Sequence, residues 1–337
     1  MPADPAPALG RAPILEWARL TGRQIDALDR TNTVVYVSSS PLEVHGPHLP
    51  TITDVAEADA LFRRMADRFA ARRAAEGGPP LTFVMLPPIY VAADVLPHVG
   101  SIAFRSSTIR RVFEDLGRSL ARQGFQHIWV GGFHGGPRHF IPVEQACDRI
   151  SRRHGVRMIG LFSVLLGALT GGRTDLADVL SHLPGVTRED LEGDAHGGLV
   201  ETSMMLAIQP QDVHPVYREL PPNTVDRWLV ARGKAPLLLE SRGRPSMPDI
   251  LRSLKEKLLY YADQTWSGHP AVASAELGER VLDELGDRAA EALWPLFTGE
   301  RPLTSARSPV WKLRPVFSAG WVSWLFERAV GYRSRVW

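Results

Sequence analysis

The stretch TVVYVSSSPLEVHGPHLP, residues 33–50, joins a β-branched and aromatic run to a dense polar loop. Residues 33–37 are of the types that form strands covered on both faces of a sheet. Similar short apolar runs occur at 81–86, 127–130 and 156–162. Each has the length of a buried strand, so these runs are expected to lie in one sheet.

Helical patterns separate the predicted strands. Apolar residues recur at helical spacing in 54–75, and further helices are expected at 107–122 and 142–154. The alternation of strands and helices predicts an α/β fold, in which a mainly parallel sheet is flanked by helices on both faces. Later helical patterns at 249–262 and 273–293 are interpreted as additions to the same domain.

Composition limits the function. The 337 residues include 39 Lys plus Arg and 37 Asp plus Glu, a net charge of +2. This balance argues against a nucleic-acid groove, which depends on neutralising phosphates. The single cysteine, Cys147, allows no intramolecular disulfide and no cysteine cage for zinc, so any metal must be held by histidines and carboxylates.

The chain is expected to divide into a flexible N-terminal arm (1–12), a single α/β domain (13–310) and a Trp-rich C-terminal segment (311–337). The N-terminus lacks a signal-peptide pattern, which favours a cytoplasmic protein. The longest apolar stretch, 158–169, is too short to span a bilayer and is expected to be a buried strand and its exit. The Trp-rich segment is expected to dock on the body or on another subunit rather than on a membrane surface.

The polar loop after the first strand contains Glu43, His45, His48 and, at the following helix start, Asp54. Glu43 and His45 are two residues apart, so on an extended segment their side chains point to the same side. This mixture of oxygen and nitrogen donors suits Zn²⁺, Mn²⁺ or Fe²⁺. Taken singly, each side chain could also be a loop residue satisfied by backbone hydrogen bonds.

Two further clusters follow later in the chain. GGFHGG, residues 131–136, matches neither a phosphate loop nor a dinucleotide fingerprint, and its glycines favour close backbone approach with His134 as a ligand. DAHGGLVETS, residues 194–203, contains His196 and Glu201. From position alone, Glu201 could equally be a first-turn acid that stabilises its helix.

Together these clusters resemble the creatininase (creatinine amidohydrolase) family over roughly residues 33–210. The resemblance rests on three motifs and a weaker C-terminal echo at 268–278: Glu43-Val-His-Gly-Pro-His-Leu-Pro with Asp54, His134-Gly-Gly, and His196-Gly-Gly-Leu-Val-Glu-Thr-Ser. It implies a three-layer fold, a site for two divalent metal ions and a homo-oligomer, often a hexamer. It also implies a hydrolase that acts on non-peptide C–N bonds. The substrate types that it allows are a cyclic amide, a formamide or a terminal peptide bond of a small metabolite or modified peptide.

By matching positions, the resemblance implies metal ligands at five residues, with Asp54 bridging: Glu43, His45, Asp54, His134 and Glu201. It also implies catalytic roles for His196, in proton transfer, and for Glu201. When bound, such metals lower the pKa of a shared water and polarise the scissile carbonyl.

Departures from the family pattern lie after His134. Creatinine-hydrolysing members carry an aromatic residue and a Glu where this chain has Gly135 and Gly136, so creatinine is not the expected substrate. Substrate contacts are expected from four residues: His48, Gly135, Gly136 and Arg138. Arg138 could anchor a carboxylate or phosphate, or could instead begin the next helix in solvent together with His139. The missing Glu also motivates an alternative, a non-catalytic metal-stabilised binding or assembly subunit of a biosynthetic pathway. A family member repurposed for another bond cleavage is a further alternative.

Overall fold

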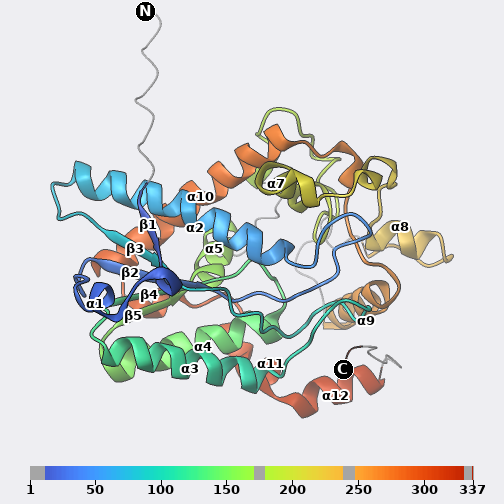
Figure 1. The fold of residues 1–337 in the computed structure, drawn as a ribbon. Coiled ribbons are helices and arrows are strands. Elements are labelled where there is room, and N and C mark those ends of the chain that lie inside the picture. The colour runs from blue at the N-terminus through green and yellow to red at the C-terminus, as the bar shows by residue number, and fades with distance from the viewer. Residues whose placement is uncertain (1–11, 171–178, 238–246, 330–335, 337) are drawn as a thin grey trace, which may run out of the picture.

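A computed structural model describes residues 12–170, 179–237, 247–329 and 336. At its centre, five parallel strands form a sheet in the order β1-β3-β2-β4-β5 (Figure 1). Their bounds are β1 Ile14–Glu16, β2 Thr33–Ser38, β3 Thr82–Met85, β4 His127–Gly131 and β5 Arg157–Gly160. The three-residue edge strand β1 was not predicted from the sequence. The predicted arm lies outside the described residues except for Ala12.

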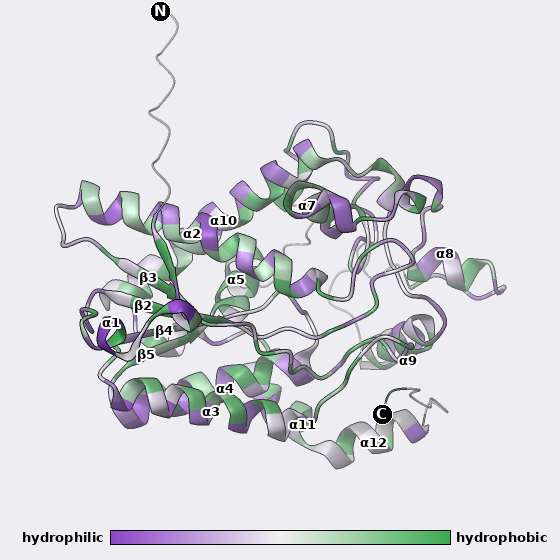
Figure 2. Cartoon of the chain, viewed as in Figure 1, coloured by the Kyte–Doolittle hydropathy of each residue, from purple (hydrophilic) through white to green (hydrophobic). Residues whose placement is uncertain are grey.

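Helices cover both faces of the sheet, which confirms the predicted α/β class (Figure 1). One layer contains α2 (Thr53–Ala75), α5 (Leu161–Thr170) and α10 (Ala275–Thr298), and it buries Phe69 and Trp294 against the sheet. The other layer contains α3 (Ser106–Arg122) and α4 (Pro137–His154), which contact each other extensively. These flanking helices carry both hydrophobic and hydrophilic residues, as helices with one buried face do (Figure 2).

Among the remaining described α-helices, the first connects β1 to β2, and the others lie beyond the carboxyl edge of the sheet or near the C-terminus. They are α1 Gly22–Asp26, α7 Leu199–Ile208, α8 Val225–Val230, α9 Met247–Asp263, α11 Arg314–Ser318 and α12 Gly320–Ala329. Helix α7 packs on α10 and α2, so it is held beside the carboxyl ends of the central strands.

Two predicted boundaries are wrong. The strand expected over 156–162 ends at Gly160, and the next residues form α5. Periodicity alone does not separate a buried strand from a buried helix in a short apolar run. Helix α4 begins at Pro137, where a missing N–H costs nothing, rather than at Pro142. Pro142 cannot donate to the Arg138 carbonyl, and the Ser106 hydroxyl donates to it instead at 2.7 Å.

The Trp-rich segment docks only in part. Helix α11 packs on α4, and the Ser318 hydroxyl lies 3.0 Å from Gln145 Oε1. Trp321 and Trp324 of α12 are 68% and 57% exposed. Trp337 lies outside the described residues. In the described part of the chain, every helix is too short or too polar to cross a lipid bilayer.

Candidate metal centre

The three polar clusters meet at the carboxyl edge of the sheet. Glu43 and His45 lie in the loop after β2, and His134 follows β4. Asp54 is in the first turn of α2, while Glu201 is in the first turn of α7. All five side chains are buried. Neighbouring parallel strands and the N-termini of two helices thus bring together residues that are up to 158 positions apart.

The five side chains form two groups that could each hold a metal ion and that share Asp54. In the first group, His134 Nδ1 lies 3.1 Å from Glu43 Oε2 and 3.8 Å from Asp54 Oδ2. In the second group, His45 Nε2 lies 3.4 Å from Asp54 Oδ1 and 3.6 Å from Glu201 Oε2. Because the two oxygens of Asp54 face different groups, its carboxylate has the placement that a bridging ligand needs.

The donor atoms fit a metal better than they fit one another. Two of them, His45 Nε2 and Asp54 Oδ2, are buried without a hydrogen-bond partner in the described structure, and Glu43 Oε2 has only its 3.1 Å contact with His134 Nδ1. An unpaired buried polar atom carries a desolvation penalty of about 1–3 kcal/mol. Carboxylate oxygens and imidazole nitrogens are the ligands that Zn²⁺ and related divalent metals accept. The residues present therefore fit metal ions.

The electrostatics of the cluster also favour cations. Burial by itself lowers the pKa of His45, but the Asp54 and Glu201 carboxylates outweigh it and raise the pKa to about 10. Burial also lowers the pKa of His134, but the Glu43 carboxylate outweighs this effect and raises the pKa of His134 to about 9. Without metal, protons on these imidazoles balance the buried carboxylates, and bound metal ions would take over that role.

The two glutamates respond in opposite directions. Burial disfavours the charged form of Glu43, but the adjacent His134 outweighs burial and lowers the Glu43 pKa to about 2. For Glu201, burial dominates over the attraction of His45 and raises the pKa to about 8. Glu201 Oε2 also accepts a hydrogen bond of 2.6 Å from the Gly197 N–H. Glu43 is thus the more strongly ionised of the two carboxyl groups.

His196 lies against the second group. Its ring stacks on His45 with 4.0 Å between centroids, and its Nε2 lies 2.8 Å from the Val44 carbonyl. Donation from Nε2–H to that carbonyl leaves Nδ1 as the basic nitrogen. Burial, followed by the charge of His45, lowers the pKa of His196 to about 4, so the ring is neutral near pH 7. Glu43, His45 and His196 form a third group of suitable donors.

The predicted substrate residues have different surroundings. His48 Nε2 contacts the Thr202 hydroxyl at 2.9 Å, and His48 belongs to none of the three donor groups. A side chain at Gly135 would meet only Phe162, at 3.8 Å, whereas Gly136 is tightly enclosed. Arg138 is held by Asp94, with Nη1 and Oδ1 3.7 Å apart.

The solvated helix start considered for His139 is wrong. This residue is only 2% exposed, and its Nε2 lies 3.0 Å from the Ser39 carbonyl. The imidazole of His139 therefore packs against the His134 ring, with 5.3 Å between centroids, rather than facing solvent. Its neighbour Arg138 is partly exposed.

The segment 93–96 also contributes to the site, which was not predicted from the sequence. The Ala93 carbonyl lies 2.9 Å from His134 Nε2, and the Leu96 N–H donates to Glu43 Oε1. Glu57 was not predicted either. It is fully buried one turn after Asp54, and burial, followed by the negative charge of Glu201, raises its pKa. These residues carry no motif, although an acidic residue at a core-facing helical position was a visible signal for Glu57.

Asp194 caps the N-terminus of α7, a role that was not predicted from the sequence. Asp194 accepts hydrogen bonds from the N–H groups of Leu199, at 2.5 Å, and Val200, at 3.1 Å. This carboxylate therefore satisfies the N-terminus of the helix that carries Glu201. Its position just before the His-Gly-Gly turn was visible in the sequence, but its role depends on the backbone conformation.

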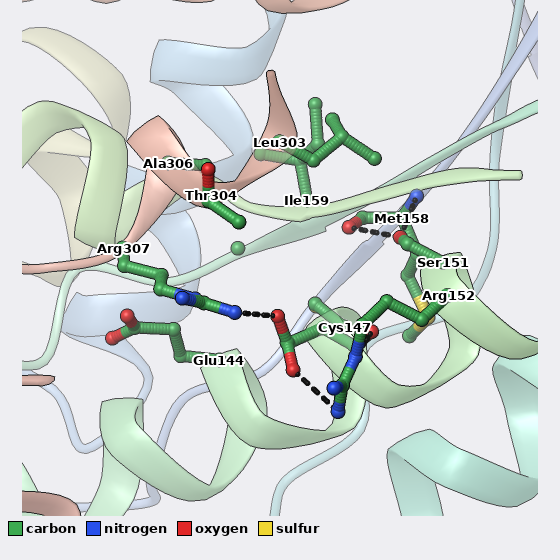
Figure 3. A pocket seen from close by; sticks show the side chains of 12 residues that line it. Glu144, Cys147, Ser151, Arg152, Met158, Ile159, Leu303, Thr304, Ala306 and Arg307 are labelled. Carbon is green, nitrogen blue, oxygen red and sulfur yellow. Dashed lines mark hydrogen bonds and ion pairs between the residues drawn. The ribbon is translucent and has the colours of Figure 1, made fainter.

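A cavity of about 210 Å³ lies away from the metal cluster, between α4, β5 and residues 303–307 (Figure 3). Asp148 on its wall pairs with both Arg307 and Arg152. Ser151 on its wall also binds the Met158 N–H and carbonyl at the free edge of β5. None of the five clustered residues lines this cavity, so the chemistry is assigned to the carboxyl edge of the sheet.

Known proteins resemble this chain over most of its length. A family model described as creatinine amidohydrolase matches residues 18–293. The mycofactocin precursor peptide peptidase of Mycobacterium ulcerans is 28% identical over 282 residues, which cover 82% of this chain and 90% of that protein. The corresponding peptidase of Mycobacterium tuberculosis is 25% identical over 283 residues, with the same coverage.

Solved structures share the fold. A protein described as a creatinine amidohydrolase from Bacteroides fragilis has a TM-score of 0.56 at 19% identity, covering 84% of this chain and 96% of its own. A mutant creatininase of Zn–Zn type has a TM-score of 0.54 at 20% identity, with 85% and 99% covered. The family match spans most of the chain and includes the two donor groups that share Asp54. The chain belongs to the creatinine amidohydrolase (creatininase) family.

Proposed function

We propose that this chain is a metal-dependent amidohydrolase that cleaves an amide C–N bond at a centre of two divalent metal ions. The observation that carries the proposal is the sharing of Asp54 by two buried donor groups, whose unpaired atoms face one another. Glu43 and His134 would hold one ion, His45 and Glu201 the other, and Asp54 would bridge them. Solved creatininases of Mn and Zn–Zn type support Mn²⁺ or Zn²⁺, with Fe²⁺ also compatible with the donors.

A terminal peptide bond of a modified peptide is the favoured substrate. The relatives at 25–28% identity are named precursor peptide peptidases, which supports a peptide over a non-peptide amide. The glycine pair 135–136 adds no side chain after His134, and the open space at Gly135 suits an extended backbone. Cyclic amides and formamides are the competing small-molecule substrates.

We assign a proton-transfer role to His196. Bound metal ions would acidify a water molecule and polarise the scissile carbonyl. The neutral His196 ring, held through Nε2 by the Val44 carbonyl, can accept a proton at Nδ1 and deliver it to the leaving nitrogen. Stacking on His45 keeps this ring beside the second donor group. Arg138, fixed by Asp94, is the proposed anchor for a substrate carboxylate.

The test is hydrolysis by chelator-stripped protein that is reloaded with Zn²⁺, Mn²⁺ or Fe²⁺. A panel of peptides, cyclic amides and formamides is followed by mass spectrometry. We expect cleavage of at least one terminal peptide bond, only in the reloaded protein. A protein that binds two equivalents of metal yet leaves the whole panel intact would instead favour the non-catalytic binding or assembly subunit, which the missing side chain at Gly136 motivates.

We also propose that copies of the chain associate through the segment 311–337, outside the α/β domain 13–310, in a homo-oligomer located in the cytoplasm. The exposed Trp321 and Trp324 support such an interface, because large aromatic side chains are enriched at protein contacts. Light scattering of the full chain and of a truncated chain measures the assembly directly. A monomeric full chain would rule out this arrangement.

A further inference from the structure

We propose that Asp94 is a positioning residue for the metal centre, because it locks the segment 93–96 that orients one ligand pair. The inference rests on the proposed function in that Glu43 and His134 are taken as ligands. Asp94 itself touches neither a metal site nor the substrate in this proposal. It acts through backbone groups on either side of it.

The segment 93–96 orients both residues of the pair. The Ala93 carbonyl accepts from His134 Nε2–H at 2.9 Å, so Nδ1 is the nitrogen that faces Glu43 and Asp54 and that could bind a metal after losing its proton. The Leu96 N–H donates to Glu43 Oε1, which leaves Oε2 facing His134. Outer contacts of this kind set the tautomer and direction of metal ligands, and their loss typically costs about 10–100-fold in metal affinity.

Asp94 holds an unfavourable backbone conformation between these two contacts. Its φ is 61°, and Asp94 is the only non-glycine residue with a positive φ among the described residues. The left-handed region costs an L-residue about 1–2 kcal/mol, although Asp and Asn tolerate it better than most. Such a conformation persists only where surrounding contacts determine it.

The contact that determines it is a helix cap. Asp94 Oδ2 accepts a hydrogen bond of 2.7 Å from the Arg138 N–H, in the first turn of α4. The carboxylate thereby satisfies a free N–H and faces the positive end of the helix dipole. The Arg138 guanidinium adds a looser ion pair at 3.7 Å. The Asp94 side chain thus joins helix α4 to the ligand-orienting segment.

The same arrangement explains why position 136 is glycine. A Cβ atom at Gly136 would lie 2.5 Å from Asp94 Cβ and 2.7 Å from His134 Nε2. A side chain at position 136 and the present placement of Asp94 exclude each other. The glycine is therefore a requirement of the Asp94 cap, rather than only the loss of a family glutamate.

A series of variants separates the two roles of Asp94. Asp94→Asn keeps an acceptor and tolerance of positive φ, Asp94→Gly keeps only the backbone freedom, and Asp94→Ala keeps neither. Asp115→Ala, which removes a carboxylate that is 72% exposed on α3, is the matched control. Two properties are measured for each: Co²⁺ affinity with its visible spectrum, and hydrogen–deuterium exchange of the metal-free chain over residues 93–96.

We expect Asp94→Ala to bind Co²⁺ about 10–100-fold more weakly with an altered spectrum, Asp94→Gly to be intermediate, and Asp94→Asn to resemble wild type. Exchange at Leu96 should accelerate at least about tenfold in Asp94→Ala, which corresponds to about 1.4 kcal/mol of lost protection. Wild-type affinity, spectrum and exchange in Asp94→Ala would overturn the inference while leaving the proposed function intact. If the wild-type protein bound no metal, the proposed function would fail, and exchange at Leu96 would alone decide the role of Asp94.

Discussion

The two donor groups of the centre are oriented in different ways. In the group of His45 and Glu201, the orienting contacts are local: His45 Nδ1 lies 3.0 Å from the Glu43 carbonyl, and Glu201 binds the Gly197 N–H four residues before it. In the group of Glu43 and His134, they come from Leu96 and Ala93, at separations of 53 and 41 residues.

This difference separates what a motif encodes from what the fold supplies. The local contacts of His45 and Glu201 form wherever their own short segments adopt the observed turns. The long-range contacts of Glu43 and His134 exist only when the segment 93–96 is held against the sheet edge. The Glu43 and His134 group is therefore expected to be the more sensitive to changes far from the ligands.

The largest expected effect removes the residue common to both groups. Asp54→Ala should abolish binding of both ions and lower hydrolysis by at least about a thousandfold, because several kcal/mol of transition-state stabilisation would be lost with the metals. Metal content and turnover are measured beside the Asp115→Ala control. Retention of full metal content by Asp54→Ala would contradict a bridging role.

The next effect falls on turnover alone. His196→Ala removes the proposed proton carrier beside His45 and should lower the hydrolysis rate about 100–10,000-fold, with metal content unchanged. Steady-state kinetics and elemental analysis separate the two properties. An unchanged rate would remove His196 from the mechanism, and a loss of metal would instead place it among the ligands.

Alanine substitutions at two adjacent glycines test the long-range orientation of Glu43 and His134. Gly136→Ala introduces a Cβ that collides with Asp94 and His134, and it should weaken one of the two metal equivalents about 10–100-fold. Gly135→Ala is the matched variant, since its Cβ would meet only Phe162 at 3.8 Å. Metal titration against a competing chelator distinguishes them, and equal affinities in both variants would count against the long-range orientation.

The pH dependence follows from the raised pKa values of His45, about 10, and His134, about 9. Below these values the metal-free imidazoles carry protons that metal must displace, so affinity should rise from pH 6.5 to 9, by up to about tenfold per unit for each imidazole. The stability of the metal-free protein should change in the opposite direction. A raised histidine pKa stabilises the fold below pH 6.5, and that contribution is lost as the pH rises through 9 to 10.

Chelator competition and thermal unfolding over this range measure the two trends. A metal affinity that does not depend on pH would contradict the protonated state of the empty cluster.

The smallest effect on the centre is expected from the C-terminus. Removal of residues 312–337 takes away the exposed Trp321 and Trp324, far along the chain from every proposed ligand. Metal content should stay at the wild-type value while the mass of the assembly falls in light scattering. A truncated chain that keeps its mass but loses binding to lipid vesicles would favour a membrane surface as the partner of these residues.

Much of the fold was predictable because its strands and helices are marked by local patterns. The runs at 33–37, 81–86 and 127–130 are strands close to their predicted bounds, and the helix at 54–75 is one residue longer than predicted. The boundary at Gly160 was not predictable, since Leu161 and its neighbours are apolar in either conformation. Strand β1 is too short for periodicity to indicate.

The candidate site divides along the same line. The motif residues Glu43, His45 and Glu201 could be named from sequence and are brought together as expected. Asp94 could not be named, because its importance lies in a positive φ and in a contact with Arg138, 44 residues away. Local patterns identify the proposed ligands, while the contacts that orient their side chains depend on the folded chain.

The most direct measurement is the number of metal equivalents bound per folded chain, determined by elemental mass spectrometry on wild type and on Glu201→Gln. Two groups that share Asp54 predict about two equivalents in wild type and about one in Glu201→Gln, because the variant weakens only the second group. Both proteins are purified without chelators and reloaded with Zn²⁺ under identical conditions. A single equivalent in both proteins, or none in wild type, would contradict a dinuclear centre.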